Sequence, residues 1–181
     1  MAHFLLKLGV LAAVGGALFF APAYDAHAAI DRTIAKANKR HTYIEYGTIS
    51  GGESGAAFTL LNVRRIFSAK DKIERILLDL GDAYGKPLKG QVSYFQAAIE
   101  KENPRVVIDL SQMLASGVNE EAIKKSFKAS PFVKEAKINF DPLDSTITIQ
   151  LLLKKNMKLE AFMLPSKDKA SRIAIDLKEK S

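Results

Sequence analysis

The sequence reads Arg-Val-Val-Ile-Asp-Leu at residues 105–110, and closely similar six-residue stretches occur at residues 75–80 and 172–177. Each stretch begins with Arg, ends with Asp-Leu and has three apolar residues between them. In an extended chain, alternate side chains point to opposite faces, so one face of each stretch is apolar and the other carries the Arg and the Asp. The three stretches therefore predict half-buried β-strands.

The surroundings of these stretches are repeated as well. Shifting the sequence by 67 positions aligns residues 91–110 with residues 158–177 without a gap, and this alignment matches Phe95 with Phe162. A repeated block of this length indicates that one structural unit occurs twice in the chain. Chance similarity between strand-like segments is the alternative.

A second block repeats upstream with a shift of 73 positions, which aligns residues 62–80 with residues 135–153. Each copy then supplies about four strands, and the two repeat halves are about residues 58–110 and 132–177. The different shifts place the length difference in the loop between the two blocks of each copy.

Alternating apolar and polar residues also predict strands outside the three stretches. A lone sheet would leave its apolar face in water, whereas two sheets can cover each other. The predicted fold is mostly β, with two small antiparallel sheets from an internal duplication packed as a sandwich. The further strands are expected at about residues 58–67, 73–80, 91–99, 134–140, 146–153 and 157–164.

One short helix is predicted between the halves. Asn119 can cap its amino end, two glutamates follow the cap, three lysines lie toward its carboxyl end, and Pro131 follows it. Ile123 and Phe127, four positions apart, lie on one face of this helix. That face covers an open end of the core or, as the alternative, binds a partner.

Residues 1–28 have the features of a secretory signal peptide. Lys7 precedes an apolar run at residues 8–20, which is shorter than the ~20 residues that a membrane-spanning helix requires. Small residues predict cleavage after Ala28, and cleavage after Ala23 or retention as an uncleaved anchor are the alternatives. The mature protein is therefore expected in the periplasm, without a stable membrane span.

Residues 29–56 are predicted to be a flexible tether, because they mix charges with several glycines and show little periodicity. A strand at residues 41–49 that adds to a sheet edge is the alternative. The β domain is predicted over residues 57–178. No cysteine occurs in the chain, so this domain is held together without disulfides.

The chain carries a formal net charge of +7, which favours an anionic neighbour. For an exported protein the expected partner is peptidoglycan or another anionic polymer of the envelope, and nucleic acid is not expected. The alternative is that the charge only maintains solubility.

Few catalytic groups remain after removal of the signal peptide. His41 is then the only histidine, and cysteine is absent, so metal sites of several imidazoles and thiol nucleophiles are excluded. Neither a metal nor a cofactor is expected, and we predict no enzymatic activity. A carboxylate pair for glycoside hydrolysis among Asp79, Asp109 and Asp176 is the remaining catalytic alternative.

The Arg and Asp of the repeated stretches are four residues apart on one face of a strand, about 13 Å, too far for a direct salt bridge within the strand. Cross-strand pairing, with each Arg near an acid and each Asp near a base, is one interpretation. A row of ligand-binding groups is the other. The candidate binding residues are Arg75, Asp79, Arg105, Asp109, Arg172 and Asp176.

The order of these strands resembles the AMIN domain family, over roughly residues 58–178. AMIN domains accompany the catalytic domain of periplasmic N-acetylmuramoyl-L-alanine amidases and occur in type IV pilus secretins. The resemblance implies two small sheets related by internal pseudo-symmetry and a role in placing the host on peptidoglycan. The chain departs from the pattern at Thr148 and Leu152, which stand where a second Arg and Asp are expected, and in its long helical linker.

The sequence thus predicts a non-catalytic periplasmic module that binds peptidoglycan or localises to the cell wall through a basic sheet face bearing arginines. The alternative is a protein-interaction factor that assembles with an amidase, a secretin, a pilus protein or a component of a cell-division complex.

Overall fold

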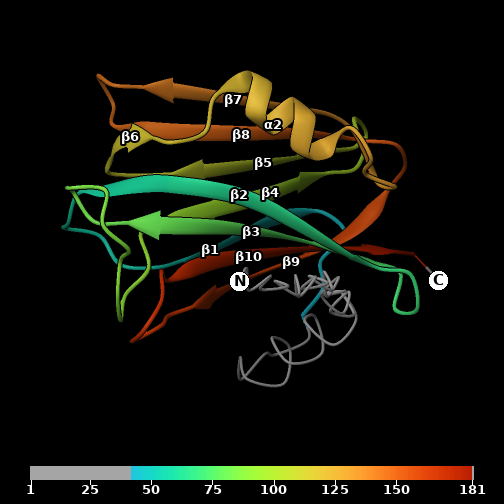
Figure 1. Ribbon diagram of the computed structural model, residues 1–181. Helices are drawn as coiled ribbons and strands as arrows, with labels where there is room; N and C mark the ends of the chain where they lie inside the picture. The colour runs from blue at the N-terminus through green and yellow to red at the C-terminus, as the bar shows by residue number, and fades with distance from the viewer. Residues whose placement is uncertain (1–41, 181) are drawn as a thin grey trace, which may run out of the picture.

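Two five-stranded sheets pack against each other, with one helix at an edge (Figure 1), in the computed structural model, which describes residues 42–180. Sheet A has the order β6-β2-β3-β10-β9, and sheet B has the order β1-β4-β5-β8-β7. All neighbouring strands are antiparallel except β2 and β6. The strands are β1 (Gly47–Gly51), β2 (Phe58–Ser68), β3 (Ile73–Gly81), β4 (Phe95–Glu100), β5 (Arg105–Leu110), β6 (Met113–Ser116), β7 (Val133–Asp141), β8 (Thr146–Leu153), β9 (Met157–Leu164) and β10 (Arg172–Glu179). The mostly β sandwich is confirmed, whereas the predicted signal peptide lies outside the described residues.

The inner faces of the two sheets form one continuous hydrophobic core. Burial of each large aliphatic side chain contributes about 1.5–3 kcal/mol, so the core is the main source of stability. Its central members come from the middle strands of both sheets: Ile76, Leu78, Ile173 and Ile175 from sheet A, and Val106, Ile108, Ile149 and Leu151 from sheet B.

Each sheet contains strands from both repeat halves. The first half supplies β2 to β5 and the second supplies β7 to β10, yet sheet A joins β2 and β3 to β10 and β9, and sheet B joins β4 and β5 to β8 and β7. In the duplication, β2 corresponds to β7, β3 to β8, β4 to β9 and β5 to β10. Exchanging each strand for its counterpart turns the order β4-β5-β8-β7 of sheet B into β9-β10-β3-β2, which is the order of sheet A read in reverse. The halves are therefore related by a pseudo-two-fold arrangement, and the pairs β3·β10 and β5·β8 join them.

The shift of 73 positions is confirmed in backbone detail. The pairing of β2 with β3 is interrupted between Leu60 and Asn62, and the pairing of β7 with β8 is interrupted between Val133 and Glu135. The shift of 73 positions matches Leu60 with Val133 and Asn62 with Glu135. The following turns also correspond, because Lys72 and Ser145 both have a φ of 51°. Shared irregularities of this kind indicate a duplicated hairpin rather than chance similarity.

The gap-free shift of 67 positions is wrong for β4 and β9. Phe95 pairs with Leu110 in sheet B, and the corresponding Leu177 of sheet A pairs with Leu159, so Leu159 is the counterpart of Phe95. Phe95 and Leu159 both lie in the core, whereas the ring of Phe162 lies against Arg75 on the outer face of sheet A. The alignment fails because the loop between β9 and β10 is longer than the loop between β4 and β5. The resulting error in the alignment of β4 with β9 is an odd number of residues, which places every side chain on the opposite face.

The helix α2 (Glu120–Phe127) closes one edge of the sandwich. The Asn119 side chain accepts a hydrogen bond from the backbone of Ala122 at 2.8 Å, as expected of an amino-terminal cap. Ile123 and Phe127 are buried, and the helix packs against β7 of one sheet and β2 of the other (Figure 1). The prediction that this face covers the core is confirmed. Within residues 42–180, the structure contains no helix that is long and apolar enough to span a membrane.

The opposite edge is closed by residues that were predicted to belong to the tether. Ile44 exchanges two backbone hydrogen bonds with Leu159 of β9, and β1 pairs with β4. Gly52 has a φ of +88°, and a Cβ there would lie 2.0 Å from the Ser93 carbonyl oxygen, so the turn requires glycine. The tether prediction is therefore wrong for residues 42–56, since the glycines form a tight turn, while its earlier part lies outside the described residues.

A buried charge network ties α2 and the chain after it to sheet A. The Glu74 carboxylate is fully buried, and it accepts hydrogen bonds from Arg65 Nη1 at 3.0 Å and Ser130 Oγ at 2.6 Å. Arg65 Nε also donates to the Ser126 carbonyl oxygen at 2.6 Å. These bonds hold the linker between the halves in place.

Replacing Glu74 by Ala is expected to lower the free energy of unfolding by about 3 kcal/mol or more, because Arg65 loses its buried partner. Urea denaturation followed by circular dichroism measures this change. The matched control is Glu120→Ala, which breaks the exposed ion pair with Lys124 and is expected to change stability by less than about 1 kcal/mol. Equal losses in both variants would show that the network does not stabilise the fold.

Candidate functional site

Two of the predicted site residues form a buried ion pair in the centre of sheet A. Arg75 of β3 and Asp176 of β10 lie opposite each other, with Nε–Oδ1 and Nη2–Oδ2 distances of 2.7 and 2.8 Å. Both side chains have no exposed surface, and the Phe162 ring centre lies 5.1 Å from the Arg75 guanidinium. The pair joins the two halves across their central strands.

The pKa of Tyr43 is changed by its burial and by the buried charges around it. Burial, and then the negative charges of Asp176 and Glu160, raise the pKa of the Tyr43 phenol far above its usual value. The phenol is therefore neutral at physiological pH. The charged groups of this cluster on the outer face of sheet A therefore interact with one another inside the protein.

The other two motif residues of sheet A are divided between partners. Asp79 lies opposite Arg172, but its carboxylate accepts two hydrogen bonds from Arg64 on the other neighbouring strand, at 2.8 and 2.7 Å. Arg172 is half-buried beside it. Cross-strand pairing thus accounts for Asp79, although its partner is outside the repeated motif.

The motif residues of sheet B are more accessible. Arg105 lies opposite Glu100, at 2.8 Å, and both side chains are about 40% exposed. The predicted acidic neighbour of Arg105 is therefore present. Asp109 does not have the predicted basic neighbour. Its carboxylate instead accepts a hydrogen bond at 2.6 Å from the hydroxyl of Thr148, the residue that replaces the Arg in the second copy.

The three candidate catalytic aspartates do not converge. Asp79 and Asp176 are about 13 Å apart along sheet A, beyond the about 5–9.5 Å between the two carboxyl groups of glycoside hydrolases, and both are in ion pairs. Asp109 is in the other sheet. Residues 42–180 also contain no group of three His, Cys, Asp or Glu side chains that could hold a metal ion.

The outer face of sheet B, which we call the polar face, carries a row of hydrogen-bonding groups across all five strands. One residue of each strand belongs to the row, and neighbouring strands lie about 4.8 Å apart, so the row is about 19 Å long. It consists of Ser50, Gln96, Asp109, Thr148 and Asn139, which are successive partners in the strand pairing.

The next row of the polar face combines small apolar residues with polar ones. It runs from Thr48 through Ala98 and Val107 to Gln150 and Lys137. Gln150 and Lys137 line both of two shallow hollows on this face, of about 130 and 220 Å³. Arg105 lines the first hollow. The side chains of Gln150 and Lys137 are exposed.

The polar face is not the basic surface that the sequence predicted. Beside Arg105 and Lys137 it carries the carboxylates of Glu100, Asp109, Glu135 and Asp141, so it has no excess of positive charge. The motif arginines are also divided between the two sheets, because each sheet contains strands of both halves. The basic interpretation of this surface is therefore wrong.

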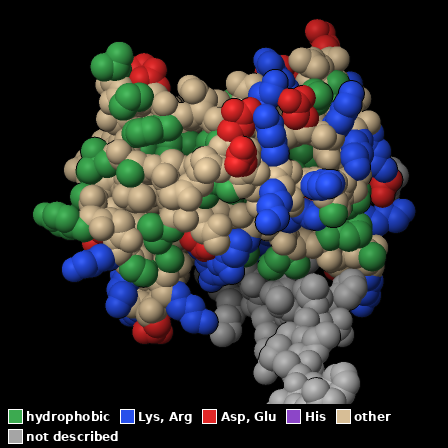
Figure 2. Space-filling model, turned by 45° about the horizontal axis from the view of Figure 1, so that its top comes forward, with side chains coloured by type: hydrophobic (Ala, Val, Ile, Leu, Met, Phe, Trp, Pro, Cys, Tyr) green, Lys and Arg blue, Asp and Glu red, His purple; other side chains and the backbone are tan. Residues whose placement is uncertain are grey.

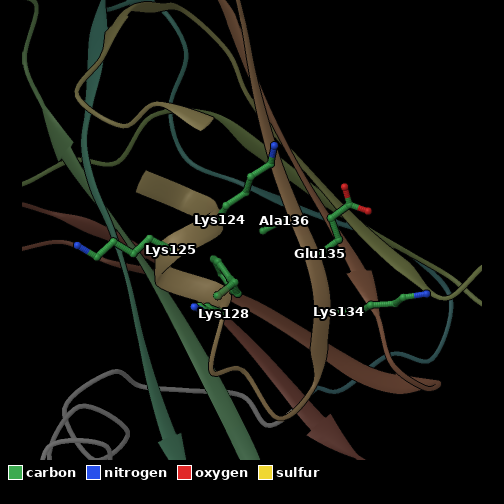
Figure 3. A pocket seen from close by; sticks show the side chains of 7 residues that line it. Lys124, Lys125, Lys128, Lys134, Glu135 and Ala136 are labelled. Atoms are coloured by element: carbon green, nitrogen blue, oxygen red, sulfur yellow. The ribbon is translucent and has the colours of Figure 1, made fainter. Parts of the chain in front are cut away.

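Lysines gather instead between α2 and β7. Figure 2 shows Lys and Arg side chains concentrated over part of the side of the molecule that carries α2. A groove of about 600 Å³ lies there, which we call the lysine groove, with Lys124, Lys125, Lys128 and Lys134 around it (Figure 3). Glu135 also lines the groove, and its carboxylate forms an ion pair with Lys137 at 3.3 Å. Sequence reasoning assigned the helix lysines to the helix dipole and missed the groove, because Lys134 joins them only in the folded chain.

Comparison with known proteins identifies no relative, so the evidence for function consists of the fold and these surfaces. No family model matches the chain, and no curated protein is similar enough to count as a match.

Replacing Arg75 alone by Met is expected to cost about 3–5 kcal/mol, because Asp176 then stays buried without its cation. The double variant Arg75→Met/Asp176→Leu is expected to recover most of this loss, since it removes both charges and keeps the packing. Urea denaturation of the two variants and the Asp176→Leu variant measures the coupling. A double variant less stable than either single one would contradict a mainly structural role for this pair.

Proposed function

We propose that this protein is a non-catalytic, exported module that binds peptidoglycan in the periplasm and localises to the cell wall. The observation that carries the proposal is the polar face, with its hydrogen-bonding row across five strands. Ser50, Gln96 and Asn139 of this row are exposed, and Asp109 and Thr148 are partly exposed. The outward address follows from the predicted signal peptide. The resemblance to AMIN domains, and a fold built from two pseudo-symmetric halves, support the same function.

The chemistry of the polar face suits a glycan. Hydroxyl and acetamido groups of a sugar chain donate and accept neutral hydrogen bonds, and Gln150, Asn139 and Gln96 offer both donors and acceptors. Each such bond contributes only about 0.5–1.5 kcal/mol, so a long chain has to engage several residues of the row. Of the six predicted site residues, Arg105 and Asp109 lie on this face and are the ones that we retain as ligand-binding candidates.

A protein-interaction role is the second candidate. The observation that favours it is the lysine groove, which lies at the edge of sheet B and has a different chemistry from the polar face. The AMIN resemblance implies an amidase or a type IV pilus secretin as the partner, and a pilus protein or a component of a cell-division complex are the further candidates.

The double variant Asn139→Ala/Gln150→Ala is expected to weaken binding to purified sacculi about fivefold or more, because two exposed hydrogen-bonding groups of the polar face are lost. Co-sedimentation of residues 29–181 with sacculi measures the affinity. Because the face has no excess of positive charge and the proposed contacts are neutral hydrogen bonds, binding is expected to survive about 0.3 M salt, where exposed ion pairs are largely screened.

The matched control is Asn62→Ala/Asn156→Ala, which removes two exposed amides outside sheet B's outer face and is expected to bind like the unaltered protein. No pelleting of the unaltered protein, or equal losses in both double variants, would contradict the proposal. Release of muropeptides from the sacculi would show an enzyme instead.

A further inference from the structure

The lysine groove combines apolar walls with positive charge at its rim. Phe127 of α2 and Ala136 of β7 line the groove, but both belong to the core and are almost completely buried, so they offer little surface to a ligand. The hydrocarbon parts of the surrounding lysines can cover apolar groups of a ligand while their ammonium groups remain at the surface. The groove can therefore accept a ligand with both apolar and anionic groups.

Most of the lysines around the groove have no acidic partner. Lys124 forms an ion pair with Glu120 at 2.7 Å, one turn earlier in α2. The ammonium groups of Lys125, Lys128 and Lys134 form no ion pair with any residue in the range 42–180. The helix dipole explains lysines at the end of α2. It does not explain Lys134, which lies on β7 across the groove.

The directions of these side chains distinguish between kinds of ligand. In Figure 3, Lys125 points away from β7, Lys134 points away from α2, and Lys124 extends upward beside β7. Cations that point in different directions suit an extended chain that crosses the groove and passes from one lysine to the next, whereas a membrane surface requires cations in one plane. Lysines, unlike arginines, act as mobile point charges and suit carboxylates at variable positions.

We propose that the lysine groove binds an acidic segment of a partner protein, with apolar side chains against the hydrocarbon parts of the lysines and carboxylates toward their ammonium groups. This interaction is separate from the binding of glycan to the polar face. Charge complementarity speeds the encounter of the two proteins and makes their association sensitive to salt.

The probe is a fluorescein-labelled synthetic peptide in which pairs of glutamates alternate with single leucines, and its binding to residues 29–181 is measured by fluorescence anisotropy. The triple variant Lys125→Gln/Lys128→Gln/Lys134→Gln is expected to lower the affinity about tenfold or more, since each exposed ion pair contributes about two- to fivefold. All three lysines are exposed, so circular dichroism is expected to show an unchanged fold.

The matched control is Lys70→Gln/Lys167→Gln/Lys169→Gln, which removes the same charge from exposed positions outside the groove and is expected to change the affinity less than about twofold. Equal losses in both triple variants would overturn the proposal, because net charge alone would then explain binding. Failure of the unaltered protein to bind the peptide, together with lysine-dependent binding to anionic vesicles, would assign the groove to a membrane surface instead. Sacculus binding by the groove variant reports separately on the polar face, so the two proposals can fail independently.

Discussion

The pairing of β3 with β10 and of β5 with β8 is the constraint on which the rest of the structure depends. Each pair joins a strand of the first half to a strand of the second, at the centre of a sheet. Neither half can therefore complete a sheet or bury its apolar residues alone. The helix α2 and the Glu74 network close the structure by fixing the linker at one edge, and Ile44 with β1 closes the other edge.

The central strand pairs of the two sheets, β3·β10 and β5·β8, have equivalent positions but differ in the side chains at those positions. In sheet A, Arg75 and Asp176 form a bidentate pair without exposed surface, which offsets the cost of burying both charges through directed hydrogen bonds. In sheet B, Thr148 replaces the Arg and holds Asp109 through a neutral donor, while Leu152 replaces the Asp beside Arg105. The motif thus stabilises one sheet, and in the other it leaves an accessible face without excess positive charge.

Local patterns in the sequence predicted much of the fold. Alternation gave most strand positions to within a few residues, and the Asn119 cap marked the start of α2, because these features depend on neighbouring residues. The assignment of Phe95 to Phe162 failed because loops of different length are invisible to a gap-free alignment. The edge strand β1 was predicted only as the alternative to a tether, at residues 41–49, because a glycine-rich segment is typical of a linker. The tight turn that requires Gly52 beside Ser93 is visible only in the folded chain.

The surfaces were less predictable than the strands. The sequence identified Arg105 and Asp109, but which strands become neighbours decides what surrounds them, and strand order is a long-range property. Gln150 and Asn139 of the polar face carry no motif, and their importance follows only from the rows that the pairing creates. The lysine groove likewise requires Lys134 to fold beside α2.

Both halves form one cooperative unit through the two central strand pairs. Native-state hydrogen exchange, measured residue by residue across increasing denaturant, tests it most directly. Amides of β3, β5, β8 and β10 are expected to exchange most slowly and to converge on a single opening free energy equal to that of global unfolding. Exchange of one half through a separate opening of lower free energy, while the other half stays protected, would contradict the account.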